Sequence, residues 1–98
     1  MQSENFLKPK ERIESDNTSE AHEWAQLRGW FTFKVESPTM NGLPDRFYGR
    51  RGVIVFVEWK KTDGTVRKQQ VKRIKEMRAH GITVYILDNM DEFKRIMR

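Results

Sequence analysis

The segment Val53-Ile54-Val55-Phe56-Val57-Glu58-Trp59-Lys60 decides the fold of this chain. Its apolar, largely β-branched run predicts a strand, and a continuous run of this kind is typical of a central strand covered on both faces. Because side chains alternate along a strand, Glu58 and Lys60 emerge on the same side, about 6.6 Å apart. An acid and a lysine at the end of an apolar strand are not explained by packing alone.

Periodic segments on either side of this strand complete the predicted order of helix, strand, strand, helix, strand, helix. The predicted elements are a helix over 13–28, strands over 30–35 and 53–60, a helix over 66–80, a strand over 82–87 and a helix over 91–97, with a loop over 37–44 and a turn over 62–65. The strand at 53–60, the helix after it and the strand at 82–87 form one βαβ unit, normally a right-handed crossover with parallel strands. The predicted fold class is therefore α/β, a small mixed sheet flanked by helices.

The start of the first helix has two interpretations. The spacing of Ala21, Trp24 and Ala25 is helical, which favours the longer helix. The Asp16–Ser19 stretch could instead cap a shorter helix that begins near Ser19. Residues 1–12 are polar and predict a flexible N-terminal arm, so the chain divides into this arm and a single domain over 13–98.

Composition narrows the function classes. The 98 residues suit one domain with a modest core, and the absence of cysteine excludes disulfides, Cys-ligated zinc and thiol catalysis. His22 and His80 are too few for a histidine metal site, so a metal would need oxygen ligands, which favours Mg²⁺ or Mn²⁺. No apolar run is long enough to span a membrane and no signal-peptide core is visible, so we expect a cytoplasmic protein without membrane contact. The net charge of +5 suits a polyanion such as DNA, or simply a soluble basic domain.

A second acid lies upstream of the strand predicted over 53–60. Pro44-Asp45 follows the loop and precedes Arg46-Phe47-Tyr48. An Asp on one strand and a Glu on its neighbour can converge on one divalent cation, with the Trp59 carbonyl, water and a phosphate oxygen as further ligands. Lys60 would then lie beside the attacking water or the scissile phosphate.

These residues form the Pro-Asp…(Asp/Glu)-x-Lys pattern of a large nuclease superfamily. From Glu14 to the C-terminus the chain resembles one branch of it, the VRR-NUC domain family. The matching pieces, in chain order, are Glu14-Ser15, Gly29-Trp30 with Lys34, Asn41-Gly42-Leu43-Pro44-Asp45-Arg46, Val57-Glu58-Trp59-Lys60, Gly64-Thr65 with Gln70, and Gly81-Ile82-Thr83-Val84-Tyr85. The resemblance implies a restriction-endonuclease-like core and a metal-dependent nuclease. Stand-alone members, some of them from phages, are similar to Holliday-junction resolvases and act on branched DNA as homodimers; a phage-encoded protein would work in the host-cell cytoplasm.

The resemblance also implies residue roles. Asp45 and Glu58 become metal ligands and Lys60 the catalytic lysine. Glu14 takes the place of the first-helix acid, which reaches the metal directly or through water, and Gln70 that of a glutamine facing the site. Trp59 is bulkier than the aliphatic residue common in the family. If the helix starts late, Glu20 would replace Glu14 as the helix acid.

Each of these residues also has a structural interpretation. Glu58 and Lys60 could form a strand-end ion pair, and Asp45 could belong to an ordinary Pro-Asp turn. Glu14 could be a solvated acid favoured by the helix dipole. Gln70, on the core face of its helix, could make a purely structural hydrogen bond.

Basic side chains near these segments are the expected DNA contacts, although charged helix faces are often only solvated. They are Lys34, Arg46, Arg50, Arg51, Arg67, Lys68, Lys72 and Arg73. The expected function is that of a Mg²⁺- or Mn²⁺-dependent DNA endonuclease without an organic cofactor, acting on branched DNA as a homodimer. The alternatives are a nuclease for linear or flapped duplex DNA and a non-catalytic DNA-binding module.

Overall fold

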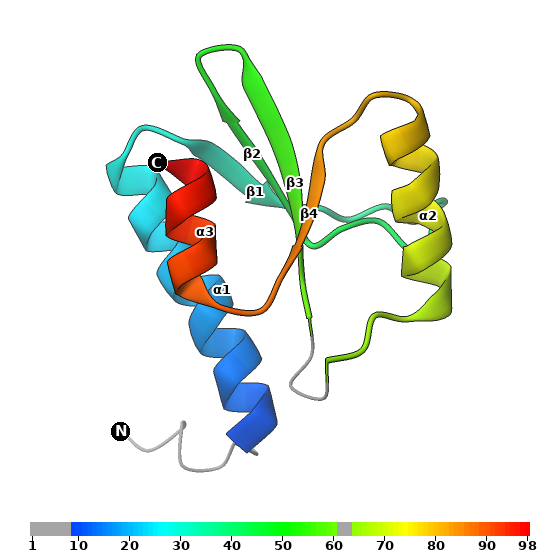
Figure 1. Ribbon diagram of the computed structural model, residues 1–98, viewed down its shortest axis with the longest axis horizontal. Coiled ribbons are helices and arrows are strands. Elements are labelled where there is room, and N and C mark those ends of the chain that lie inside the picture. Colours follow the sequence, from blue (N-terminus) through cyan, green and yellow to red (C-terminus); the bar gives the residue numbers. More distant parts are fainter. Residues whose placement is uncertain (1–8, 61–63) are drawn as a thin grey trace.

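The computed structural model describes the backbone of residues 9–60 and 64–98 and the side chains of residues 17–60 and 64–98. The elements in chain order are α1 (Pro9–Leu27), β1 (Phe31–Lys34), β2 (Arg46–Arg50), β3 (Val53–Trp59), α2 (Lys68–Ala79), β4 (Val84–Leu87) and α3 (Met90–Met97). The described strands form one sheet in the order β1-β2-β3-β4. Figure 1 shows α1 and α3 on one side of this sheet and α2 on the other. The predicted small mixed sheet flanked by helices is confirmed.

The strand pairing follows the predicted crossover but adds one strand. β3 and β4 are parallel and joined through α2, as the βαβ prediction required. β1, β2 and β3 are antiparallel neighbours. The predicted element order was wrong in leaving out β2. This strand pairs with β3 through the two-residue turn Arg51-Gly52, whose φ angles of 51° and 83° are those a tight hairpin requires.

α1 begins earlier than expected. It runs from Pro9 without a break through the Asp16–Ser19 stretch, so the interpretation with a shorter helix starting near Ser19 was wrong. Proline is well suited to a first helical turn because the N–H it lacks has no helical partner there. The arm predicted over 1–12 was therefore wrong for residues 9–12, and residues 1–8 lie outside the described part of the chain.

The main core lies between the sheet and the pair α1 and α3. Alternate residues of β3 point into it, ending with Trp59, which is 2% exposed. The rings of Trp59 and Tyr48 lie 5.5 Å and 5.4 Å from that of Phe93 on α3. The bulky Trp59 is thus accommodated as a core residue. Burial of the Tyr48 hydroxyl raises its pKa to about 12.

A smaller core joins α2 to the opposite face of the sheet. It is built on Ile74, Met77 and Val84, with Leu43 and Phe56 packed against it. The prediction that β3 is covered on both faces is confirmed only toward its Glu58 end, because Val53 and Ile54 are more than half exposed. Among the described helices, none is long and apolar enough to cross a membrane.

Candidate functional site

Asp45 and Glu58 are brought together by the pairing of β2 with β3. Arg46 lies opposite Val57 in this antiparallel register. Continuing this register by one residue would set Asp45, which directly precedes β2, opposite Glu58, and directly opposed residues share a face of a sheet. Glu58 is only 4% exposed. We call Asp45 and Glu58, which lie at the same end of β2 and β3, the carboxylate pair.

Backbone contacts hold Asp45 in this position. The Trp59 backbone N–H donates to Asp45 Oδ2 at 2.9 Å, just where β2 no longer supplies partners for β3. The Asp45 carbonyl accepts from the Val35 backbone N–H at 2.9 Å. Pro44, immediately before it, is fully buried. Asp45 is thus tied to both neighbouring strand ends and is more than a surface turn residue.

Burial raises the pKa of the Asp45 carboxyl above its ordinary value of 3.8. The hydrogen bond from Trp59 lowers this pKa, as do the positive charges of Arg67 and Lys34, but they do not cancel the cost of burying the charge. A carboxylate whose charged form is disfavoured in this way is stabilised by a cation that binds to it.

The raised pKa predicts a specific pH dependence of stability for the metal-free protein. The contribution of Asp45 to folding is fully present below pH 3.8 and is lost as the pH rises through the raised pKa. Asp45→Asn cannot ionise, so at pH 7 in EDTA it should melt above the wild type. This difference should shrink as the pH falls toward 4, as followed by circular dichroism. A variant that melts below the wild type at pH 7 would contradict the assignment.

Lys60 follows Glu58 on the same face of the sheet, by the alternation of side chains along β3. Its backbone N–H continues the ladder to the Leu87 carbonyl at 2.7 Å, so the extended conformation persists through this residue. The Lys60 side chain is half-buried. The sheet therefore places Lys60 on the same face as Glu58, and its catalytic role stays a prediction.

The first turn of α2 closes one side of the site. Gln70 is 7% exposed, and its Oε1 accepts from the Arg67 backbone N–H at 3.4 Å. Arg67 in turn lies close enough to Asp45 to lower its pKa. The placement of Gln70 toward the core agrees with the sequence pattern, and its described hydrogen bond is the structural one.

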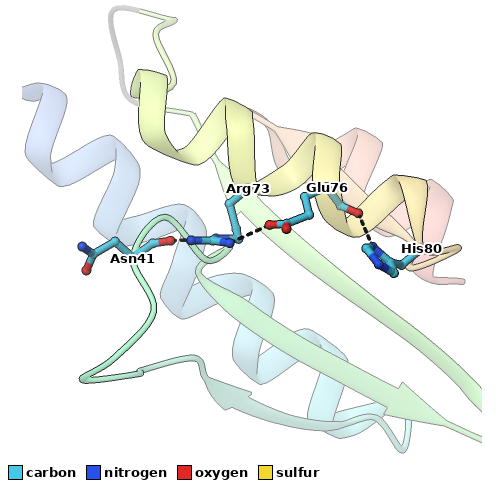
Figure 2. A network of polar contacts seen from close by, with 4 residues as sticks. All are labelled: Asn41, Arg73, Glu76 and His80. Carbon is cyan, nitrogen blue, oxygen red and sulfur yellow. Dashed lines mark hydrogen bonds and ion pairs between the residues drawn. The ribbon is translucent and has the colours of Figure 1, made fainter.

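The loop that delivers Asp45 is docked onto α2. The Asn41 carbonyl accepts from Arg73 Nε at 3.0 Å, and Arg73 also pairs with Glu76 at 2.6 Å (Figure 2). Gly42 lies so close to the helix that a Cβ there would be 2.6 Å from the Gln69 carbonyl oxygen. Arg73 therefore acts as a loop anchor in addition to the DNA contact expected of it. His80, at the other end of Figure 2, caps α2 as a C-terminal residue.

The basic residues of β2 separate into different roles. Arg46, next to Asp45, hydrogen-bonds Thr32 and His22 on the α1 side. Arg50 lies four residues farther along the strand, about 13 Å away, and Arg51 is in the hairpin turn at the opposite end of β3 from Glu58 (Figure 1). Of the three arginines expected to contact DNA here, Arg50 and Arg51 therefore lie away from the carboxylate pair, because an extended strand separates them from it.

Arg50 is engaged by the protein itself. Its guanidinium lies 4.3 Å from the centre of the Trp30 ring and donates to the carbonyls of Arg28 and Arg98 at 2.9 and 3.2 Å. Arg50→Ala should lower the free energy of unfolding by about 1–2 kcal/mol in urea denaturation. DNA affinity should stay near that of the wild type, in contrast to Lys68→Ala on the exposed first turn of α2. Unchanged stability with weakened DNA binding would reverse this assignment.

The helix acid remains a prediction. Glu14 lies on α1, but its side chain is outside the described ones. Its alternative, Glu20, makes an ion pair with Lys94 of α3 at 3.5 Å. That pairing directs Glu20 toward the neighbouring helix.

An open pocket of about 260 Å³ lies beside Arg46, and the sequence predicted no such pocket. It is lined by Thr18, Ser19, His22, Glu23 and Arg46. The spacing of residues 18, 19, 22 and 23 on one helix face could have indicated a shared surface.

The donors present suit a hard divalent cation. Among the side chains described, no group of three or more His, Asp or Glu residues gathers as a metal site. Mg²⁺, however, is commonly held by one or two protein carboxylates together with water and substrate phosphate. Asp45 and Glu58 meet that requirement with oxygen ligands alone.

Comparison with known proteins agrees with this geometry. No family model and no curated protein sequence matches the chain. A solved structure described as a "VRR_NUC domain" superposes with a TM-score of 0.77 at 25% sequence identity, covering 87% of this chain and 94% of that one. With the fold shared over most of both chains, this protein has the restriction-endonuclease-like fold of a VRR_NUC domain.

Proposed function

We propose that the protein is a DNA endonuclease that depends on Mg²⁺ or Mn²⁺. The observation that carries the proposal is the placement of Asp45 against the end of β3, where it accepts a hydrogen bond from the Trp59 backbone N–H beside the buried Glu58. The likeness to a solved VRR_NUC domain supports a nuclease. A DNA-binding module without catalysis would not require a buried acid opposite a second acid.

Asp45 and Glu58 would hold the cation, with the Trp59 carbonyl as a backbone ligand and Glu14 as the helix acid. When bound, a divalent ion supplies an activated water and charge neutralisation at the phosphate. Lys60 orients the attacking water and offsets the negative charge that develops on the phosphorus oxygens. Gln70 and Arg67 line the α2 side, where Arg67 attracts the phosphate.

DNA is the proposed partner because exposed cations lie on the elements around the carboxylate pair. Lys34 and Arg67 act on Asp45 directly, and Lys68 and Lys72 are exposed on α2. Such contacts make affinity depend on salt rather than on base sequence. We further propose branched DNA as the preferred substrate. Cutting a four-way junction symmetrically needs two equivalent sites, hence a homodimer.

The test is cleavage of a labelled four-way junction and of a linear duplex of matched sequence, each with Mg²⁺, Mn²⁺ or EDTA. We expect paired nicks in the junction that require metal and that EDTA abolishes. Equal cutting of both substrates would support the proposed nuclease activity but contradict the proposed preference for branched DNA. DNA binding without cutting in either metal would favour the non-catalytic module.

A further inference from the structure

An uncovered row of aromatic rings lies on the α2 side of the sheet. Phe31 and Phe33 on β1 are 68% and 44% exposed, and Ile54 on β3 is 54% exposed. The Phe33 ring stacks on that of Phe47 at 4.6 Å with an interplanar angle of 17°, and Phe31 meets both rings edge-on. We call Phe31, Phe33, Phe47 and Ile54 the aromatic face. α2 packs over the β4 side of the sheet and leaves this face open.

The register joins the aromatic face to the carboxylate pair. Phe33, Phe47 and Phe56 are directly opposite one another across β1, β2 and β3. Phe47 is two residues from Asp45 and Phe56 two residues from Glu58, a distance of about 6.6 Å along each strand. Side chains two apart share a face, so the rings begin one step from the acids. A DNA strand with its phosphate at the acids would have these rings within reach of the neighbouring nucleotides.

The geometry of the rings is specific. Gly49 has no side chain, and a Cβ there would be 3.1 Å from the edge of the Phe47 ring. The glycine thus lets Phe47 lie over its own strand and stack on Phe33. Exposure increases from the half-buried Phe47 to Phe33 and then to Phe31 at the sheet edge. The rings form a stack that continues outward from the core.

The size of the aromatic face argues against a second copy of the chain as its occupant. At about 200 Å² for each such side chain, the exposed parts of Phe31, Phe33 and Ile54 amount to roughly 300 Å². A stable dimer buries about 800 Å² on each partner. The face is sufficient, however, for one or two bases, which stack on aromatic rings in single-strand-binding proteins.

Charge favours the same occupant. The strand positions that form the face are all apolar, while Lys34 and Arg67 lie near Asp45. The cations can bind the phosphate of a nucleotide, and the adjacent apolar rings can stack on its base. Bases inside a duplex have both faces stacked already, so free rings select unpaired bases.

We propose that the aromatic face stacks the bases of unpaired nucleotides next to the scissile phosphate. This inference rests on the proposed nuclease function and refines it. The protein would thereby prefer DNA with unpaired or splayed bases, such as branch points, over an intact duplex.

The experiment measures binding in EDTA, so that it does not depend on catalysis. Fluorescence anisotropy compares a labelled single strand with a duplex of the same length, for the wild type, Phe33→Leu and Phe33→Trp. The leucine keeps an apolar side chain but removes the ring. We expect Phe33→Leu to weaken single-strand binding about tenfold with little effect on duplex binding. Phe33→Trp, which keeps an aromatic ring, should bind the single strand about as tightly as the wild type.

Leu27→Ala is the matched control, because Leu27 is 84% exposed and lies at the end of α1, off the sheet face. It should leave both affinities unchanged, and melting curves confirm that each variant is folded. Equal loss on single strand and duplex, or no loss on either, would overturn the proposal. So would sedimentation showing that Phe33→Leu dissociates a dimer while single-strand affinity is unchanged. If single-strand binding depends on the Phe33 ring but the protein cuts no DNA, only the proposed nuclease function is overturned.

Discussion

Lys60→Ala is expected to lower the cleavage rate by at least about 10²–10³-fold, the usual cost of removing one group that stabilises charge at the reacting phosphate. The lysine lies on the same face as Glu58 and contributes no part of the main core. Its loss should therefore leave the fold and DNA affinity largely intact. The measurement is the single-turnover rate at saturating protein, with DNA affinity determined separately.

Lys68→Ala is the matched control for this prediction, since it removes an exposed lysine from the neighbouring first turn of α2. It should weaken DNA binding modestly and leave the saturated rate near that of the wild type. Wild-type cleavage by Lys60→Ala at saturation would show that the lysine is not catalytic.

Gly42→Ala is expected to cost about 3 kcal/mol in the free energy of unfolding and to lower activity as well. Gly42 has φ +81°, a conformation that is strained for any residue with a Cβ, and the new methyl would meet the backbone of Gln69. The loop must shift away from α2, and Asp45 lies three residues farther on. Urea denaturation and cleavage rates measure the two effects.

Gly81→Ala separates backbone strain from the clash. Gly81 has φ +83°, but nothing lies within 4 Å of the Cβ it would gain. It should lose only about 1–2 kcal/mol from strain and should keep full activity. Equal losses of stability and activity in the two variants would show that docking of the loop on α2 does not position Asp45.

The central features of the site could be predicted from local pattern. The apolar run before Glu58 predicted β3, and period-two alternation placed Lys60 on the same side. The Pro-Asp segment before this strand indicated an acid on a neighbouring strand, although β2 itself was left out of the predicted element order. The crossover from β3 to β4 also followed, since its handedness and parallel strands are general properties of βαβ units.

Features that depend on tertiary packing could not be predicted in this way. β2 is short and carries an arginine at each end, so its own composition predicts a strand only weakly, and pairing with β1 and β3 stabilises it. The role of Arg50 depends on its approach to Trp30, which lies 20 residues earlier in the chain. Docking of Gly42 on α2 is likewise a long-range contact. The Arg51-Gly52 turn was a local signal that could have revealed β2.

The central claim is that Asp45 and Glu58 together hold a divalent cation. The most direct measurement is calorimetric titration of Mn²⁺ into the metal-free protein, comparing the wild type with Glu58→Gln, which preserves the shape of the side chain and removes one ligand charge. The account predicts saturable binding to the wild type that is weakened at least about tenfold in the variant, as is usual for changes in and around metal ligands. Equal Mn²⁺ affinity in the two proteins would contradict it.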